Sequence, residues 1–322
     1  MTLDPAVAAV RLAVRHDLVD VGDHAVLVAC SGGADSLALL AATVFEARRT
    51  AWHVVGVTVD HGLQDGSDAR AELVVTQMVR LGAAETVAVR VNVDPGGRGV
   101  EAAAREARYA VLEEVATRFG SHVVLLGHTL DDQAETVLLG LTRGSGGRSL
   151  AGMRHRFGDF RRPLLHITRA QTEAACRAES IDVWSDPHND DPRFTRSRIR
   201  HRVLPVLDEE LGPGVADALA RTAESLRPDM EALDGLAGHL YAEVRAPHGV
   251  ATGALEAHPS ALVTRVLRLA ALEAGSPASE LFRVHVNAMA DLVHGPARGE
   301  VQLPGHVTAY RTEDRLLFRR TV

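Results

Sequence analysis

The stretch ACSGGADS (residues 29–36) joins a short apolar run to a helical pattern. Residues 24–30 (HAVLVAC) predict a buried strand, and residues 37–48 predict the amphipathic helix that follows it. The two glycines between them permit positive φ angles and a close backbone approach, so successive N–H groups can point at one anion at the helix N-terminus. Ser31 and Ser36 can donate further hydrogen bonds to phosphate oxygens. The stretch therefore predicts a phosphate site between a strand and a helix.

The chain contains no lysine, because all 35 of its basic residues are arginine. Schiff-base chemistry on a lysine of the protein and a phosphate-loop lysine are therefore excluded. A GC-rich coding sequence explains this bias without a functional cause. The forked donors of arginine suit phosphate and nucleic acid but do not require either.

Length and composition bound the class of protein. A chain of 322 residues with 46% hydrophobic and 24% charged residues predicts a globular protein of about two domains. No uncharged apolar run approaches the ~18 residues that span a bilayer, so we expect a cytoplasmic protein without a membrane partner. Cys30 and Cys176 form no CxxC pair, so neither a zinc site nor a disulfide framework is predicted.

The charge is distributed unevenly along the chain. The net charge of −7 argues against a nucleic-acid partner, since phosphate binding usually leaves a basic footprint. Residues 143–202, however, hold 13 arginines against 7 acids, which is a local charge of +6. We interpret this segment as one basic face on an otherwise acidic protein, or as a solvated surface with scattered ion pairs.

Apolar runs alternate with helical patterns through the first half of the chain. The predicted strands are at 24–30, 53–59, 86–93 and 122–127, and the predicted helices at 36–49, 67–82, 100–119 and 131–142. This alternation is typical of an α/β fold with a doubly wound parallel sheet. Ligands bind beyond the carboxyl ends of such strands, where residues 31–36, 60–63 and 127–135 fall. The segments that follow three strands are thus expected to line one cleft.

The cluster LGPG at 211–214 is the best candidate for a domain boundary. We expect residues 1–212 to form the α/β domain and residues 213–322 a smaller, mostly helical one. The second domain is predicted from helical patterns at 215–245, 258–274 and 279–292 and from two short strand patterns within 299–319. Further helices are predicted near 168–179 and 195–210.

Residues 127–135 (GHTLDDQAE) follow the fourth strand and open a helix. If the helix begins near residue 130, Asp132 and Glu135 share one face and Asp131 points away. Two convergent carboxylates suit a primary ammonium group, a magnesium ion, or both. An acidic helix N-terminus that complements the dipole is the alternative. A zinc or di-iron site with His128 lacks a second helix that supplies histidine ligands.

Residues 99–109 (GVEAAAREARY) predict a helix with an alanine-rich face. Glu101 and Arg105 have the spacing of a helical ion pair, and Arg108 lies farther along the helix. Most such pairs face solvent. A face walled by alanine can nevertheless lie close to a cleft, where an arginine orients a carboxylate.

Together these segments resemble the PP-loop ATP pyrophosphatase superfamily, and within it the tRNA(Ile)-lysidine synthetase family. The motifs that carry the resemblance are SGGADS at 31–36, VDHGL at 59–63, GVEAAAREARY at 99–109, GHTLDDQAETVLLGLTRGSG at 127–146, RPLL at 162–165 and SDPHNDDPRFTRSRIR at 185–200. They cover residues 24–212 in order, whereas SGGADS alone would identify only the superfamily. We expect the short architecture of the family.

The resemblance implies an enzyme that modifies the wobble cytidine of the CAU anticodon of tRNA(Ile). ATP would activate the C2 carbonyl oxygen as an adenylate with release of pyrophosphate. Free L-lysine would then attack C2 through its ε-amine, AMP would leave, and the base would become lysidine. The sequence leaves the oligomeric state open, a homodimer included.

The resemblance also implies roles for residues of each motif. The residues expected to bind ATP are Ser31, Gly32, Gly33, Ala34, Asp35, Ser36, Asp60 and His61, with Asp35 holding Mg²⁺. Lysine is expected at Arg108, Asp132 and Glu135. Asp35, His128 and Asp132 are the expected catalytic residues.

For the RNA, the resemblance and the basic segment together predict phosphate contacts. The expected tRNA-binding residues are Arg143, Arg193, Arg196 and Arg200, with the C-terminal domain as a further recognition element. The target base must be splayed out of its loop. The arginine-asparagine pair of the family is here Arg196-Ser197, so an amide hydrogen bond at that place is not expected.

Two other classes of function are weighed against this one. Thiolation by a related enzyme generally needs a cysteine pair or an iron–sulfur cluster, which Cys30 and Cys176 support poorly. A nitrogen-transfer enzyme that acts on a small molecule is the runner-up. A non-enzymatic ATP-binding switch would need the glycine loop but neither Asp132 with Glu135 nor the basic segment.

Overall fold

A computed structural model describes residues 3–22, 24–62, 66–91, 100–144, 146–184, 191–295 and 298–321. Several residues of the sequence motifs lie outside this description: Leu63, Gly99, Ser145, residues 185–190 and the side chain of Glu101. The chain divides into two compact units, Met1–Leu138 with Met153–Ala220, and Leu139–Gly152 with Arg221–Val322. The predicted boundary between residues 212 and 213 stays a prediction.

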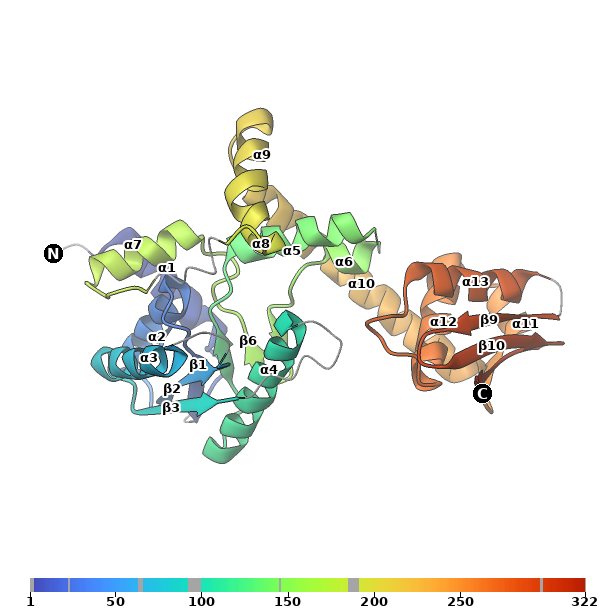
Figure 1. The fold of residues 1–322 in the computed structure, drawn as a ribbon, viewed down its shortest axis with the longest axis horizontal. Coiled ribbons are helices and arrows are strands. Elements are labelled where there is room, and N and C mark those ends of the chain that lie inside the picture. Colours follow the sequence, from blue (N-terminus) through green and yellow to red (C-terminus); the bar gives the residue numbers. More distant parts are fainter. Residues whose placement is uncertain are drawn as a thin grey trace. The chain divides into compact units, whose positions relative to one another are not determined.

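The first unit is built on a six-stranded sheet with the order β3-β2-β1-β4-β6-β5 (Figure 1). Its strands are β1 (Ala25–Ala29), β2 (His53–Asp60), β3 (Glu85–Arg90), β4 (Val124–Leu126), β5 (Arg156–Phe157) and β6 (Phe160–Arg161). All neighbouring pairs are parallel except β5 with β6. The predicted α/β fold is therefore confirmed. The strand order reverses between β1 and β4, which is where such sheets bind ligands.

The helices before residue 212 also follow the predicted alternation. They are α1 (Pro5–Asp17), α2 (Ala34–Ala47), α3 (Ser67–Leu81), α4 (Val100–Phe119), α5 (Leu130–Arg143), α6 (Gly147–Leu150), α7 (Arg169–Ala178), α8 (Thr195–Arg198), the π-helix η2 (Ile199–Val203) and α9 (Leu204–Leu211). The hairpin of β5 and β6 and the helix α1 were not predicted. Helix α1 is nevertheless encoded locally, because Asp4 caps it and Val7, Val10 and Val14 form a buried stripe.

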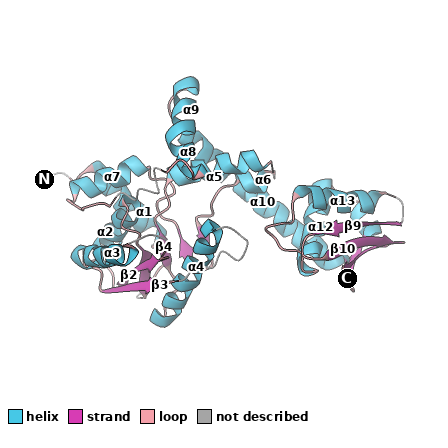
Figure 2. Cartoon of the chain, viewed as in Figure 1, coloured by secondary structure: helices cyan, strands magenta, loops and turns pink. Residues whose placement is uncertain are grey.

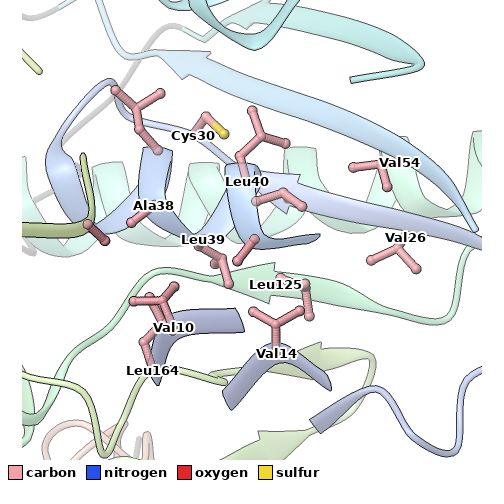
Figure 3. Packing of buried hydrophobic residues seen from close by; sticks show 14 of the residues in the cluster. Val10, Val14, Val26, Cys30, Ala38, Leu39, Leu40, Val54, Leu125 and Leu164 are labelled. Carbon is pink, nitrogen blue, oxygen red and sulfur yellow. The ribbon is translucent and has the colours of Figure 1, made fainter. Parts of the chain in front are cut away.

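Side chains of β1 alternate between two hydrophobic clusters, one on each face of the sheet. Val26 and Val28 pack with α1, α2, α3 and α7. Leu27 faces the opposite way and packs with Leu112 and its neighbours on α4. Figure 3 shows side chains of the first cluster between these helices and the sheet. The two clusters hold the carboxyl ends of β1, β2 and β4 in fixed register, which positions the loops of the site.

The second unit combines helices with an antiparallel sheet (Figure 2). Its strands β7 (Arg245–Ala246), β8 (Gly249–Ala251), β9 (Arg298–Leu303), β10 (Val307–Thr312) and β11 (Arg315–Arg320) lie in the order β7-β8-β11-β10-β9. Its helices are the later part of α10 (Val215–Val244), α11 (Thr252–Glu256), α12 (Ser260–Glu273) and α13 (Arg283–His294). The predicted helices are confirmed. The sheet is larger than predicted, because residues 298–320 form three strands and residues 245–251 add two.

Within the described part of the chain, no helix combines the length and the apolar character needed to cross a membrane.

Candidate active site

The phosphate loop connects β1 to α2. Gly32 has φ +85°, and a Cβ there would come within 2.8 Å of Val74 Cγ2, so this position requires glycine. Gly33 has a negative φ and serves as the N-cap of α2, where no side chain caps the helix. The Ser36 hydroxyl accepts from the Ser31 N–H at 3.1 Å and donates to the Gly33 carbonyl at 2.9 Å. The first turn of α2 thus faces the carboxyl edge of the sheet with its amides uncapped by side chains, as an anion site requires.

The loop between β4 and α5 lies directly against the phosphate loop. A Cβ on Gly127 would stand 3.1 Å from the carbonyl carbon of Asp35 and from the backbone N and Cα of Ser36. Because β1 and β4 are neighbours, this close approach brings the first turn of α5 beside the first turn of α2. The acidic motif and the phosphate motif therefore share one site.

Arg169, the first residue of α7, joins the carboxylates of the two motifs. Its guanidinium lies 3.4 Å from Asp35 Oδ2, 2.9 Å from Asp132 Oδ1 and 3.7 Å from Glu135 Oε1. The hydroxyl of Thr172, one turn farther along α7, donates to the other oxygen of Asp35. The structure thus brings Asp35, Asp132 and Glu135 together around one cation.

Asp132 and Glu135 lie on one face of α5, as predicted, whereas Asp131 accepts from the backbone N–H of Arg169 at 2.7 Å. Arg200, which we predict to bind tRNA, lies 2.7 Å from Glu135 Oε1 and 3.5 Å from Asp132 Oδ1. Its position on η2 turns it inward, onto the predicted lysine site. Glu135 is fully buried, and its Oε2 has no hydrogen-bond partner among the described residues.

The three carboxylates differ in pKa because their surroundings differ. Burial raises the pKa of Asp35 to about 6, although Arg169 and Thr172 oppose the shift. Burial also raises the pKa of Glu135, against the opposing effect of Arg200. For Asp132, burial is outweighed by Arg169, the Thr129 N–H and Arg200, so its pKa is lowered. The site therefore contains one firmly ionised carboxylate and two that bind protons more readily.

His128 is a neutral imidazole. Arg162 donates from Nε to His128 Nδ1 at 3.1 Å, so Nδ1 is an acceptor and the ring proton is on Nε2. Burial lowers the pKa of His128 to about 3, and Asp132 only partly opposes this. The sequence could not give this protonation state, because Arg162 lies 34 residues away on the chain.

Asp60 ends β2 at the same edge of the sheet, and His61 follows it. Asp60 accepts from the Gly62 N–H at 2.8 Å and lies 3.7 Å from Arg90, so its carboxylate organises the turn after the strand. Nδ1 of His61 is buried and has no hydrogen-bond partner within the described ranges. Burial lowers the pKa of His61, and the charge of Arg108 adds to this effect.

Arg108 is near His61 and Arg196 and forms no ion pair with Asp132 or Glu135 in the described structure. Burial lowers its pKa; Tyr109 opposes the shift, and the charges of Arg105 and Arg196 add to it. A half-buried guanidinium next to two others is suited to an anionic ligand.

Of the remaining predicted tRNA residues, Arg143 and Arg193 are exposed and Arg196 is half-buried. Arg193 pairs with Asp191 at 2.6 Å while its side chain stays 80% exposed. Arg143 is exposed in the last turn of α5, within the part of the chain that belongs to the second unit.

Sequence reasoning missed Arg169, Thr172 and Arg162. A local signal was present for the first two, because Thr168 and Gln171 form a capping box that marks the start of α7. The capping box predicts where the helix begins, but it does not predict which carboxylates the Arg169 side chain contacts.

Asp35 suits a magnesium ion held jointly with phosphates. Among the described residues, no group of three or more His, Cys, Asp or Glu side chains is arranged to hold a metal ion by itself. Mg²⁺ typically binds one or two carboxylates together with substrate phosphates, and Asp35 offers a carboxylate at the N-terminus of α2.

Comparisons with known proteins agree with this geometry. Residues 8–207 match the PP-loop domain family, and residues 251–317 match the TilS substrate binding domain. The U34-tRNA thiolase of Methanococcus maripaludis shares the fold, with a TM-score of 0.56 at 19% identity over 69% of this chain and 79% of that one.

Similar sequences extend over almost the whole chain. The tRNA(Ile)-lysidine synthase of Streptomyces coelicolor is 49% identical over 98% of this chain and 99% of its own length. The enzyme of the same name from Thermobifida fusca is 49% identical over 97% of both chains. From the fold, the site and these similarities together, the chain belongs to the tRNA(Ile)-lysidine synthase family.

Proposed function

We propose that the protein uses ATP to join lysine to C2 of the wobble cytidine in the CAU anticodon of tRNA(Ile). The observation that carries this proposal is the contact of one guanidinium, that of Arg169, with carboxylates of both the phosphate motif and the acidic pair. A phosphate-binding group and an ammonium-binding group so close together fit a reaction between a nucleotide and an amine.

In the first half-reaction, the phosphate loop binds the triphosphate. The N–H groups at the start of α2 and the hydroxyls of Ser31 and Ser36 bind the phosphates that leave as pyrophosphate. Asp35 would hold Mg²⁺, which when bound would neutralise charge on those phosphates. The C2 oxygen of the cytosine bonds to the α-phosphorus as the bond to pyrophosphate breaks. Asp60 and His61 border the nucleotide side of the site.

In the second half-reaction, Asp132 and Glu135 bind the ε-ammonium group of lysine. The amine must lose a proton before it attacks C2, since an ammonium has no lone pair. Glu135 is suited to accept that proton because its raised pKa makes it a stronger base than an exposed glutamate. AMP then leaves with the C2 oxygen. Arg108, next to the site and without an acidic partner among the described residues, orients the carboxylate of lysine.

His128 assists as a neutral hydrogen-bond donor rather than as an acid. With Nδ1 accepting from Arg162, Nε2–H is the group that can donate to the adenylate.

The tRNA is bound through exposed or half-buried arginines and through the second unit. Arg143, Arg193 and Arg196 supply phosphate contacts near the anticodon. Arg200 stays a candidate for tRNA binding. Its contacts with Glu135 and Asp132 also place it beside the proposed lysine site. We place the reaction in the cytoplasm, where tRNA, ATP and free lysine are available together.

The proposal is tested by incubating the purified protein with ATP, Mg²⁺, radiolabelled lysine and single tRNA transcripts. Nucleoside analysis should detect lysidine only with tRNA(Ile) that carries the CAU anticodon. Labelled product on a small molecule, or no product under any condition, would refute the proposal.

The phosphate role is tested by Asp35→Ala. We expect loss of tRNA-dependent pyrophosphate release by at least about 100-fold, because the variant lacks the carboxylate that holds the metal. Unchanged turnover in this variant would contradict the assignment.

A further inference from the structure

Arg169 contacts the site in a way that no other described side chain does. Three different guanidinium nitrogens approach three different carboxylates: Nε is 3.4 Å from Asp35, Nη2 is 2.9 Å from Asp132 and Nη1 is 3.7 Å from Glu135. Arg200 approaches only Asp132 and Glu135. Asp35 belongs to α2 and the other two carboxylates to α5, so only Arg169 links the two helices in this way.

The backbone of Arg169 is fixed as firmly as its side chain. Its N–H donates to the Asp131 carboxylate at 2.7 Å. Two residues earlier, the carbonyl of Ile167 accepts from the Leu130 N–H at 3.0 Å. The capping box of Thr168 and Gln171 holds the first turn of α7. The N-termini of α5 and α7 are therefore docked on each other by one backbone–backbone hydrogen bond and by the Asp131 carboxylate, and Arg169 projects from this junction with a side chain that is only 20% exposed.

One buried carboxylate oxygen at this junction lacks a hydrogen-bond donor. Asp35, Asp132 and Glu135 share the guanidinium groups of Arg169 and Arg200, and Oε2 of Glu135 is buried without a partner in the described structure. A buried carboxylate oxygen without a donor is costly unless a ligand supplies one. A substrate ammonium supplies the missing hydrogen bond, provided that the carboxylates keep their spacing.

We propose that Arg169 is a positioning residue that sets the separation between the phosphate-side carboxylate Asp35 and the amine-side carboxylates Asp132 and Glu135. This inference rests on the proposed function. It adds that adenylate formation and lysine attack both depend on one guanidinium that touches neither the transferred phosphorus nor C2. A lysine at position 169 carries the same charge, but its single nitrogen cannot reach both sides at once.

The test measures the two half-reactions separately in the full-length protein. Adenylation is followed as pyrophosphate release with ATP and tRNA in the absence of lysine, and the amine side as the KM for lysine in lysidine formation. For Arg169→Gln we expect both to worsen by at least about tenfold, as for loss of a charge-assisted hydrogen bond on each side. For Arg169→Lys we expect recovery of one of the two quantities only.

Two matched variants separate this role from general destabilisation. Arg200→Gln should raise the KM for lysine; with tRNA at saturation, its pyrophosphate release should fall less than that of Arg169→Gln, since Arg200 contacts the amine-side carboxylates and not Asp35. Arg11→Gln removes a guanidinium that pairs with Glu179 just after α7, and it should change neither quantity. Circular dichroism and thermal melting check folding, and if Arg169→Gln does not fold, Arg169→Lys with Arg200→Gln decides the question.

The inference fails if Arg169→Gln changes neither half-reaction, if Arg169→Lys restores both, or if Arg200→Gln reproduces both defects. A wild-type protein that forms no lysidine refutes the proposed function instead, so the two failures are distinguishable.

Discussion

At the scale of single residues, Asp35 and Asp132 show how placement decides the chemistry of one side-chain type. Both are carboxylates within reach of Arg169, yet burial raises the pKa of Asp35 to about 6 while Arg169 and other donors lower that of Asp132. Asp132 has the Thr129 N–H at 2.9 Å and two arginines, whereas Asp35 has the Thr172 hydroxyl and a single arginine, Arg169, at the longer distance of 3.4 Å. The extra donors decide the difference.

The raised pKa of Asp35 predicts that the pH profile of kcat/KM for ATP has an acid limb, in which activity falls as the pH is lowered. Because the carboxylate must be ionised to hold Mg²⁺, kcat/KM for ATP should fall about tenfold per pH unit below pH 6. Thr172→Val removes a hydroxyl that stabilises the ionised form, so it should move the limb to higher pH. A limb below about pH 4.5 in the wild type, or an unshifted limb in the variant, would contradict the assignment.

Glu135→Gln tests the amine site with its shape retained. We expect the KM for lysine to rise about 10- to 100-fold, the cost of losing a charged hydrogen-bond acceptor, and kcat for lysidine formation to fall because an amide cannot accept the amine proton, with little change in pyrophosphate release. Glu46→Gln is the matched control, because Glu46 is also buried and is paired with Arg15 at 2.8 Å. A lysine KM that changes equally in both variants would show that the effect is structural.

At the scale of elements, the close approach of Gly127 to the first turn of α2 holds the two motifs together. Gly127→Ala should destabilise the fold by roughly 1–3 kcal/mol and raise the KM for ATP, because the neighbours at 3.1 Å are backbone atoms that cannot turn away. Gly235→Ala, on α10 with open space around it, should be neutral or stabilising by about 0.5–1 kcal/mol. Chemical denaturation and ATP kinetics measure both effects.

The sequence could predict these elements because their signals are local. Apolar runs gave β1 and β2 within two residues of their observed ends, and helical periodicity gave α2 through α5. Asp132 and Glu135 could be placed on one face because three residues on a helix make nearly one turn. Arg169 could not be assigned, since its partner Asp35 is 134 residues away and the contact exists only once α7 docks beside α2. The strands β7 and β8 were missed because each is too short to show a period.

At the scale of the whole molecule, the basic segment is less available to RNA than its composition indicates. Of its arginines, Arg169 and Arg200 face the acidic site. Arg156 and Arg161 pair with Asp20, which lies three residues beyond the end of α1. Part of the local charge of +6 therefore stabilises the first unit and its site. The exposed Arg193 and the half-buried Arg196 remain the strongest candidates for phosphate contact.

Because only some arginines of the basic segment are available to RNA, we expect a modest salt dependence of tRNA binding. Each phosphate contact to a single-stranded loop contributes a slope of about −0.7 to log K against log salt concentration. Arg193→Gln and Arg196→Gln should each make the slope shallower by about 0.7 and weaken binding of tRNA(Ile) and other tRNAs alike, because phosphate contacts carry little sequence information. Arg80→Gln, an exposed arginine at the end of α3, is the control and should leave the slope unchanged. Filter binding from 50 to 200 mM NaCl measures the slope for the wild type, the two variants and the control. Equal slopes in all four proteins would show that this segment is not part of the RNA interface and that its arginines have only structural and catalytic roles.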